Sequence, residues 1–296
     1  MTFNRKVCRT GKTWAFKSFV SHHTEINRIY WAFVPAWSYV DYKVRHEKNK
    51  DLKSLLKASG PNVRRIAENL NQFKKDSDDL ANWLRLSVMM SAVSYFEIYM
   101  KRAITLSLLS DPAARFGKPG FIDGTIWLKN GIKENLNDLI IPCIKGVWSS
   151  RINNLEKLLG RQVPDFIYGN IKILEDIRTK RNKVAHSFGR DGSDKDIELI
   201  IPKTEETIKL KEKKLLEIMQ SIFDISSCLD SNFFLFHIGS FEEIIYYHDF
   251  KFKHSYYKKN KSPSDFRKYF NAMSFGMQTP ISTEYAKSLI KYYENI

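Results

Sequence analysis

One stretch, residues 76–110, constrains this chain more than any other because it contains neither glycine nor proline. Its apolar residues recur at intervals of three to five positions and would line one face of a helix: Leu80, Leu84, Val88, Val93, Phe96, Met100, Ile104 and Leu108. Asp76-Ser77-Asp78 suits a helix start, and Asp111-Pro112 ends the pattern. We predict a helix of about 30 residues, long enough to be the spine of a helical bundle.

Further helices are predicted on both sides of this spine. In residues 13–57, aromatic residues recur every three or four positions, which predicts a buried helical face that Pro35 kinks or splits. Other helical patterns cover residues 62–75, 133–147, 149–159, 164–186 and 212–236, and three C-terminal segments begin at Ser240, Ser262 and Ser282. Residues 197–210 suit a small β-ribbon. The predicted fold class is all-α, with an aromatic-rich N-terminal extension (1–75), a central bundle (76–236) and a C-terminal extension (237–296).

Charge and cysteine content narrow the choice of partners. The chain has 48 Lys and Arg against 33 Asp and Glu, a net charge of +15, which favours a polyanion such as RNA, DNA or a membrane surface, unless the basic surface is simply solvated. Cys8, Cys143 and Cys228 are far apart and lack metal-site spacing, so we expect neither a disulfide framework nor a zinc site, and a cytoplasmic location. No apolar run reaches the roughly 20 residues that cross a bilayer, so no membrane partner is expected.

The residues best suited to chemistry stand at the end of the helix predicted over 164–186. Arg181 offers a planar fork of donors to phosphate oxygens, and His186 is of the type that moves protons near neutral pH. Asn182 lies four residues before His186 and so on the same helix face, and Arg178 extends this polar stripe. A proton carrier beside a fixed cation is what RNA cleavage by its own 2′-hydroxyl requires.

Arg181-Asn-x-x-x-His186, between two long helices, resembles the active motif of the HEPN superfamily, which is R-x4-6-H with Asn or Asp often following the Arg. The preceding helix carries Glu97, Lys101 and Arg102, which is similar to the E-x-x-x-K-R pattern of several HEPN ribonucleases. The resemblance covers about residues 76–236. It implies a helical bundle, a metal-independent endoribonuclease without cofactor, and a supporting role for Glu97 as a brace across the bundle.

The resemblance also implies a partner. HEPN ribonucleases dimerise with their motif helices facing each other, so a homodimer is expected to complete the site. Lys180, Lys183 and Arg190 would contact the RNA backbone, and Tyr99 and Phe188 could stack on bases, although core packing suits Tyr99 better. Such proteins often act in phage defence or as growth-arresting toxins, which adds an antitoxin or a phage-derived trigger as a partner. Toxins controlled by AMP transfer carry Tyr two residues after the His, where this chain has Phe188.

Other functions fit the residues too. A HEPN-like scaffold without catalysis could bind nucleic acid or protein, with Arg181 as a surface charge and His186 favoured by the helix dipole. A DNA-binding regulator fits less well, because no recognition-helix turn stands out. Gly11-Lys12-Thr13 lacks the earlier glycine and the preceding strand of a phosphate-binding loop. The remaining histidines lack acidic neighbours at metal-site spacing, and His237 suits a core position.

Overall fold

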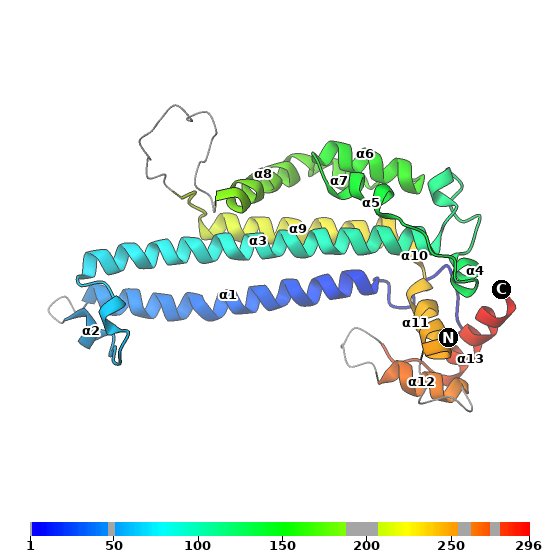
Figure 1. The fold of residues 1–296 in the computed structure, drawn as a ribbon, viewed down its shortest axis with the longest axis horizontal. Helices are drawn as coiled ribbons and strands as arrows, with labels where there is room; N and C mark the ends of the chain where they lie inside the picture. Colours follow the sequence, from blue (N-terminus) through cyan, green and yellow to red (C-terminus); the bar gives the residue numbers. More distant parts are fainter. Residues whose placement is uncertain (1, 47–50, 188–206, 254–261, 273–278) are drawn as a thin grey trace. The chain divides into compact units, whose positions relative to one another are not determined.

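The computed structural model describes residues 2–46, 51–187, 207–253, 262–272 and 279–296, and within these residues the protein is helical with no strand, which confirms the all-α class (Figure 1). The chain forms two compact units. Unit 1 comprises Met1–Ser21, Tyr95–Asp176 and Ile222–Ile296; unit 2 comprises His22–Ser94 and Ile177–Ser221. Four helices, α1, α3, α8 and α9, contribute residues to both units. Among the helices described, none is long and apolar enough to span a membrane.

The predicted spine is present and longer than expected. Helix α3 runs over Leu70–Ser110, so residues 62–75 hold a 3₁₀ turn, Val63–Arg65, and the first turns of α3, not a separate helix. Asp76 is therefore inside the helix, and the prediction that it begins there is wrong. The side chain of Asn69 accepts a hydrogen bond from the Gln72 amide at 2.9 Å, which satisfies one of the free donors at the helix start.

The N-terminal aromatic region also forms one helix. Helix α1 covers Trp14–His46 with Pro35 inside it, so the predicted split does not occur (Figure 1). Proline removes one backbone donor, but Pro35 and Trp31 both lie at exposed positions, where water can serve the carbonyl that loses its partner. The predicted aromatic core is only partly right. Phe16, Phe19 and Tyr30 are buried, while Trp31, Tyr39 and Tyr42 are exposed.

Unit 2 holds the part of α1 from His22 onwards and the part of α3 up to Ser94. These two helical segments run in opposite directions (Figure 1). It also contains the short α2 (Leu52–Leu55), the end of α8 (Ile171–Ser187) and the start of α9 (Glu212–Leu229). Helix α9 is tied to α1 by two hydrogen bonds, Tyr30 Oη to Glu212 Oε2 at 2.7 Å and His23 Nε2 with the Met219 carbonyl at 3.2 Å. Unit 2 is thus a small helical bundle built from distant parts of the sequence.

Unit 1 contains the shorter helices. They are α4 (Gly124–Lys129), α5 (Asn137–Ile144), α6 (Trp148–Leu159), α7 (Asp165–Gly169), α10 (Leu235–Ile238), α11 (Phe241–Lys253), α12 (Pro263–Asn271) and α13 (Thr283–Asn295). The helix predicted over 212–236 is interrupted, because a π-helical turn, Asp230–Phe234, separates α9 from α10. The helix predicted over 164–186 is likewise divided into α7 and α8.

The three C-terminal helices form one aromatic core in unit 1 and lie close together in Figure 1. Ser262 and Ser282 cap α12 and α13 as predicted. Ser240 directly precedes α11, where its carbonyl accepts from the Ile244 amide at 3.4 Å and its hydroxyl donates to the Val7 carbonyl at 2.5 Å. The predicted β-ribbon lies mostly in residues 188–206, outside the described residues, and the described part, 207–210, is neither helix nor strand.

Candidate functional site

Helix α8 presents the Arg-His motif from one end. Its buried face is formed by Leu174, Ile177 and Val184, which recur at helical spacing. Arg181 is four residues after Ile177 and three before Val184, so its side chain leaves the helix on this same apolar face and is half-buried. Partial burial restricts the conformations of a long side chain, so this guanidinium is held more firmly than one on an open surface.

His186 and Asn182 lie on a different face. His186 is exposed in the last turn of α8, and Asn182 is half-buried one turn earlier. A guanidinium N–H of Arg181 donates to Asn182 Oδ1 at 3.3 Å. Asn182 therefore contacts the cation of the motif, and its position four residues before His186 puts it on the same side as the imidazole. The structure thus places all three motif residues on one short helical segment, with His186 open to solvent.

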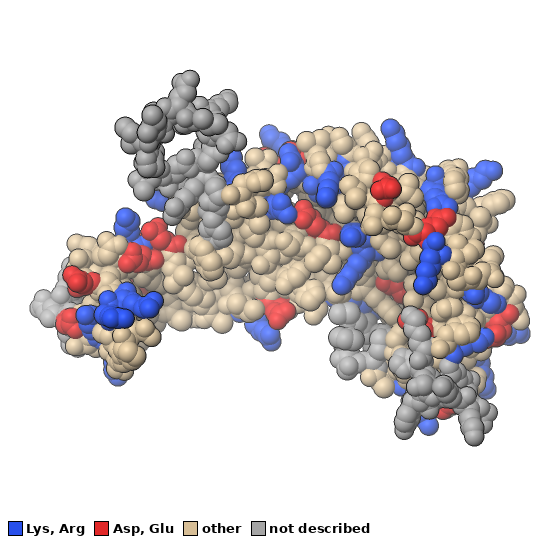
Figure 2. Space-filling view, viewed as in Figure 1, with Lys and Arg blue, Asp and Glu red and all other residues tan. Residues whose placement is uncertain are grey.

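The predicted basic neighbours divide into two groups. Lys180 and Arg178 are half-buried on α8, and Lys183 is exposed. Arg190 and Phe188 lie outside the described residues, as does the glycine-containing stop after the motif. On the face drawn in Figure 2, Lys and Arg side chains are spread in small groups among acidic and uncharged residues. The net charge alone therefore does not mark the site on this face.

The second predicted motif belongs to unit 1. Glu97 is half-buried, whereas Lys101 and Arg102 are exposed, and Arg102 donates to Ser18 Oγ at 3.1 Å. The expected brace from Glu97 to the Arg-His motif stays a prediction. Tyr99 is only 1% exposed and donates to the Ser226 carbonyl at 3.2 Å, so it packs in the core and does not offer a base-stacking surface.

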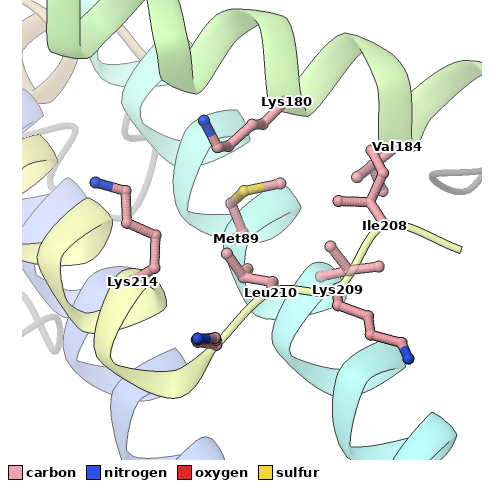
Figure 3. A pocket seen from close by; sticks show the side chains of 9 residues that line it. Met89, Lys180, Val184, Ile208, Lys209, Leu210 and Lys214 are labelled. Carbon is pink, nitrogen blue, oxygen red and sulfur yellow. The ribbon is translucent and has the colours of Figure 1, made fainter.

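Sequence reasoning missed a pocket of about 250 Å³ that α8 shares with α3, α9 and the residues just before α9 (Figure 3). Its apolar lining consists of Leu86, Met89, Val184, Ile208 and Leu210. Its charged lining consists of Lys180, Lys209, Lys211 and Lys214. Figure 3 shows the ends of Lys180 and Lys214 on the same side of the pocket, while Lys209 points away on the other side. The run Lys209 to Lys214 was the sequence signal that could have drawn attention to it.

Asn82 and Arg85, both on α3, fix the irregular wall of this pocket. The Asn82 amide donates to the Ile208 carbonyl at 2.9 Å and accepts from the Leu210 amide at 2.8 Å. Arg85 donates to the Leu210 carbonyl. A segment that is neither helix nor strand thereby has these backbone groups paired, as a nearly buried segment requires. Side chains of α3 therefore hold the pocket wall in place before any ligand binds.

Other His, Cys and acidic residues form no metal-binding group in the part of the chain that the structure describes. His237 is buried, as predicted, and its Nδ1 lies 3.0 Å from Asp111 Oδ2, a pairing across 126 residues of sequence that no local pattern announces. Cys8, Cys143 and Cys228 are not joined in disulfides.

An all-α bundle that carries Arg181, Asn182 and His186 in the last turns of one helix agrees with the fold predicted for a HEPN protein. The model of the RiboL-PSP-HEPN family matches residues 61–227, more than half of the chain, and the chain therefore belongs to that family. The matched region includes α3, α8 and the pocket. At the level of the family, HEPN domains are associated with RNA, and they often dimerise. Comparisons with curated proteins and with solved structures gave no match.

Proposed function

We propose that this protein is a metal-independent endoribonuclease that cuts single-stranded or loop RNA and needs two copies of the chain to form each site. The observation that carries the proposal is the burial and the contacts of the motif residues on α8. His186 is exposed, while Arg181 is half-buried and contacts Asn182 at 3.3 Å. A proton carrier that solvent can reach and a cation held in place are the two groups that phosphodiester cleavage needs.

The chemistry follows from these groups. One His186 takes the proton from a ribose 2′-hydroxyl, whose oxygen attacks the adjacent phosphorus. Arg181 binds the phosphate oxygens as negative charge builds up on them, through two parallel N–H donors. The second His186 gives a proton to the departing 5′-oxygen. The products are a 2′,3′-cyclic phosphate and a 5′-hydroxyl, and no water or metal enters this step.

The helical positions support a site formed by two chains. Residues five positions apart on a regular helix point in directions roughly 140° apart, so Arg181 and His186 of one chain leave α8 on different faces. A second α8, facing the first across a twofold axis, would add a second His186 to the site. A base and an acid are then available at once, which a single His cannot supply in one step.

The test is incubation of the purified protein with total RNA in excess chelator, followed by detection of cyclic-phosphate ends. Cleavage should be lost in His186→Ala and in Arg181→Ala and be weak in Arg181→Lys, because Lys offers only a point charge. His46→Ala is a matched control, since His46 is also exposed in the last turn of a helix. Equal cleavage by His186→Ala and His46→Ala would contradict the proposal.

A second candidate is a HEPN-like scaffold that binds nucleic acid or protein without cutting. The position of Arg181 on the apolar face of α8 favours it, because an Arg there can serve packing alone. RNA binding that persists in wild type and in every variant, with no cleavage in any of them, would select the scaffold. The cytoplasmic location, a role in phage defence or as a toxin, and an antitoxin or phage-derived trigger belong to the ribonuclease proposal as implications of its family.

A further inference from the structure

The lysine-lined pocket combines two chemistries that one ligand must satisfy. Its floor is apolar, formed by side chains such as Met89, Val184 and Leu210, and its edge carries four lysines. A purely ionic ligand would make no use of the apolar floor, and a purely apolar ligand would make no use of the positive charges at the edge. The pocket therefore suits an anion that carries a flat apolar group.

From this combination, and resting on the proposed action on RNA, we propose that the pocket holds one unpaired base of a single-stranded RNA, with the phosphates on its two sides bound by lysines. The volume fits this occupant. About 250 Å³ is slightly below the roughly 300 Å³ at which pockets for drug-sized ligands begin, which suits a single base.

The arrangement of the lysines matches a strand that enters and leaves the pocket. Figure 3 shows Lys180 and Lys214 on one side and Lys209 pointing away on the other. A nucleotide within a strand has one phosphate on its 5′ side and one on its 3′ side, so cations on two sides of the pocket can bind both. Lys214 pairs with Glu217 at 3.1 Å on an exposed surface, and such pairs contribute little, so a phosphate can take its place.

The pocket wall offers little to read a base edge. The Ile208 carbonyl and the Leu210 amide are both bonded to the Asn82 side chain, and the Leu210 carbonyl accepts from Arg85. The base would be held by apolar contact with its faces, to which the thioether of Met89 adds a favourable sulfur–ring contact. Contacts of this kind tolerate every base, so we expect little sequence preference at this position.

The pocket also lies next to the motif in sequence and on the same helix. Lys180 and Val184 line it and stand on either side of Arg181 along α8. A phosphate on Lys180 would be one helix position from the cation that binds the phosphate to be cut. The pocket would then hold a nucleotide near the phosphate that Arg181 binds and keep it unpaired, which would favour single-stranded RNA.

The test measures binding of a short fluorescein-labelled oligouridine by anisotropy, with His186→Ala as the background so that the RNA stays intact. Lys180→Ala with Lys214→Ala is compared with Lys172→Ala combined with Lys213→Ala, which removes the same charge from exposed positions of the same two helices outside the pocket. The pocket pair should weaken binding at least tenfold more than the control pair. Its salt dependence should fall by about 0.7 in log–log slope, as for one lost phosphate contact on a single strand, because both lysines lie on the same side of the pocket.

A second measurement isolates the base. In the His186→Ala background with an unchanged pocket, an oligomer of the same length with abasic positions should bind about tenfold more weakly than oligouridine. The abasic oligomer lacks the base that contacts the pocket. In Ile208→Trp, whose larger side chain fills part of the pocket, the two oligomers should bind alike. Thermal unfolding confirms that each variant is folded. Equal binding of abasic and normal RNA to the unfilled pocket would overturn the inference.

The outcomes separate this inference from the ribonuclease proposal. Cleavage by the wild type, together with pocket variants that bind like their controls, would leave the ribonuclease and remove the base pocket. The expected binding pattern, with no cleavage of any RNA, would leave the base pocket and remove the ribonuclease. Equal weakening of a single-stranded DNA oligomer would still support a base pocket, with the sugar unread. Binding of phosphatidylglycerol vesicles through these lysines, without RNA binding, would overturn it.

Discussion

Among the residues that the structure describes, Arg and polar partners meet on α8 in unit 2 and in the core of unit 1, and these two places differ in how deeply the Arg is buried. In unit 1, Arg5 is 4% exposed and donates to the Ser110 carbonyl and hydroxyl, to the Ile238 carbonyl and to Asp123. On α8, Arg181 is half-buried and His186 faces solvent. The same residue types are therefore fully buried in one place and partly exposed in the other, where we propose that they act on RNA.

His186→Ala gives the largest expected effect and tests the α8 side of this comparison. Cleavage should fall by about 10²–10⁴-fold, the usual contribution of a positioned acid or base. The melting temperature should stay close to that of the wild type, because an exposed side chain in a last helical turn contributes little packing. Initial rates on a labelled RNA and a thermal melt of the same sample measure both. A large loss of stability would mean that His186 has a structural role, as Arg5 does.

Arg5→Met tests the structural role of the Arg5 cluster in unit 1. Removing a buried cation leaves Asp123 without its ion-pair partner and takes a guanidinium donor from each of two carbonyls, which should lower the free energy of unfolding by about 3–5 kcal/mol. Urea titration of wild type and variant gives the difference. Arg28→Met is a suitable control, because Arg28 is exposed on α1, and it should change stability by no more than about 0.5 kcal/mol. A similar small change for Arg5 would refute its structural role.

Glu242 extends the comparison to pH. It accepts from the Trp14 amide at 2.7 Å and the Ala15 amide at 3.3 Å at the start of α1, and burial raises its pKa to about 8. A carboxyl whose pKa is higher in the folded state binds protons more tightly there, so its contribution to stability is full below about pH 4.5 and is lost as the pH rises through 8.

The expected result is a stability that declines by a few kcal/mol between pH 5 and pH 8, since one pKa unit corresponds to about 1.4 kcal/mol. Denaturant titrations across this range should show a shallower decline for Glu242→Gln, which does not titrate. Asp230 and Glu243, whose pKa values burial also raises, keep part of the slope in the variant. Identical slopes for variant and wild type would show that Glu242 titrates at its ordinary value.

Sequence reasoning predicted the elements whose signal is local and missed those that depend on distant partners. The apolar periodicity before Ser110 and the motif on α8 are continuous in sequence, so both were predicted. The start of α3 was misplaced because Asp76 and Asn69 are both good capping residues, and only the backbone shows which one caps. The pocket wall escaped prediction because Asn82 holds residues 126 and 128 positions away. The Arg5 cluster joins partners 105 to 233 positions apart, and no pattern along the chain reveals such contacts.

Asn182→Ala gives the smallest expected effect and tests whether Asn182 supports stability, as Arg5 does, or the proposed cleavage, as His186 does. Asn182 contacts Arg181 through one hydrogen bond of 3.3 Å at a half-buried position, so its loss should cost no more than about 1 kcal/mol of stability. Cleavage should fall by about tenfold, because a hydrogen bond to a charged group that orients it is worth about 1.5 kcal/mol. Asn182→Asp should restore the contact to Arg181 yet cleave poorly, since its carboxylate repels the phosphate that Arg181 binds. Full activity in both variants would reduce the motif to Arg181 and His186.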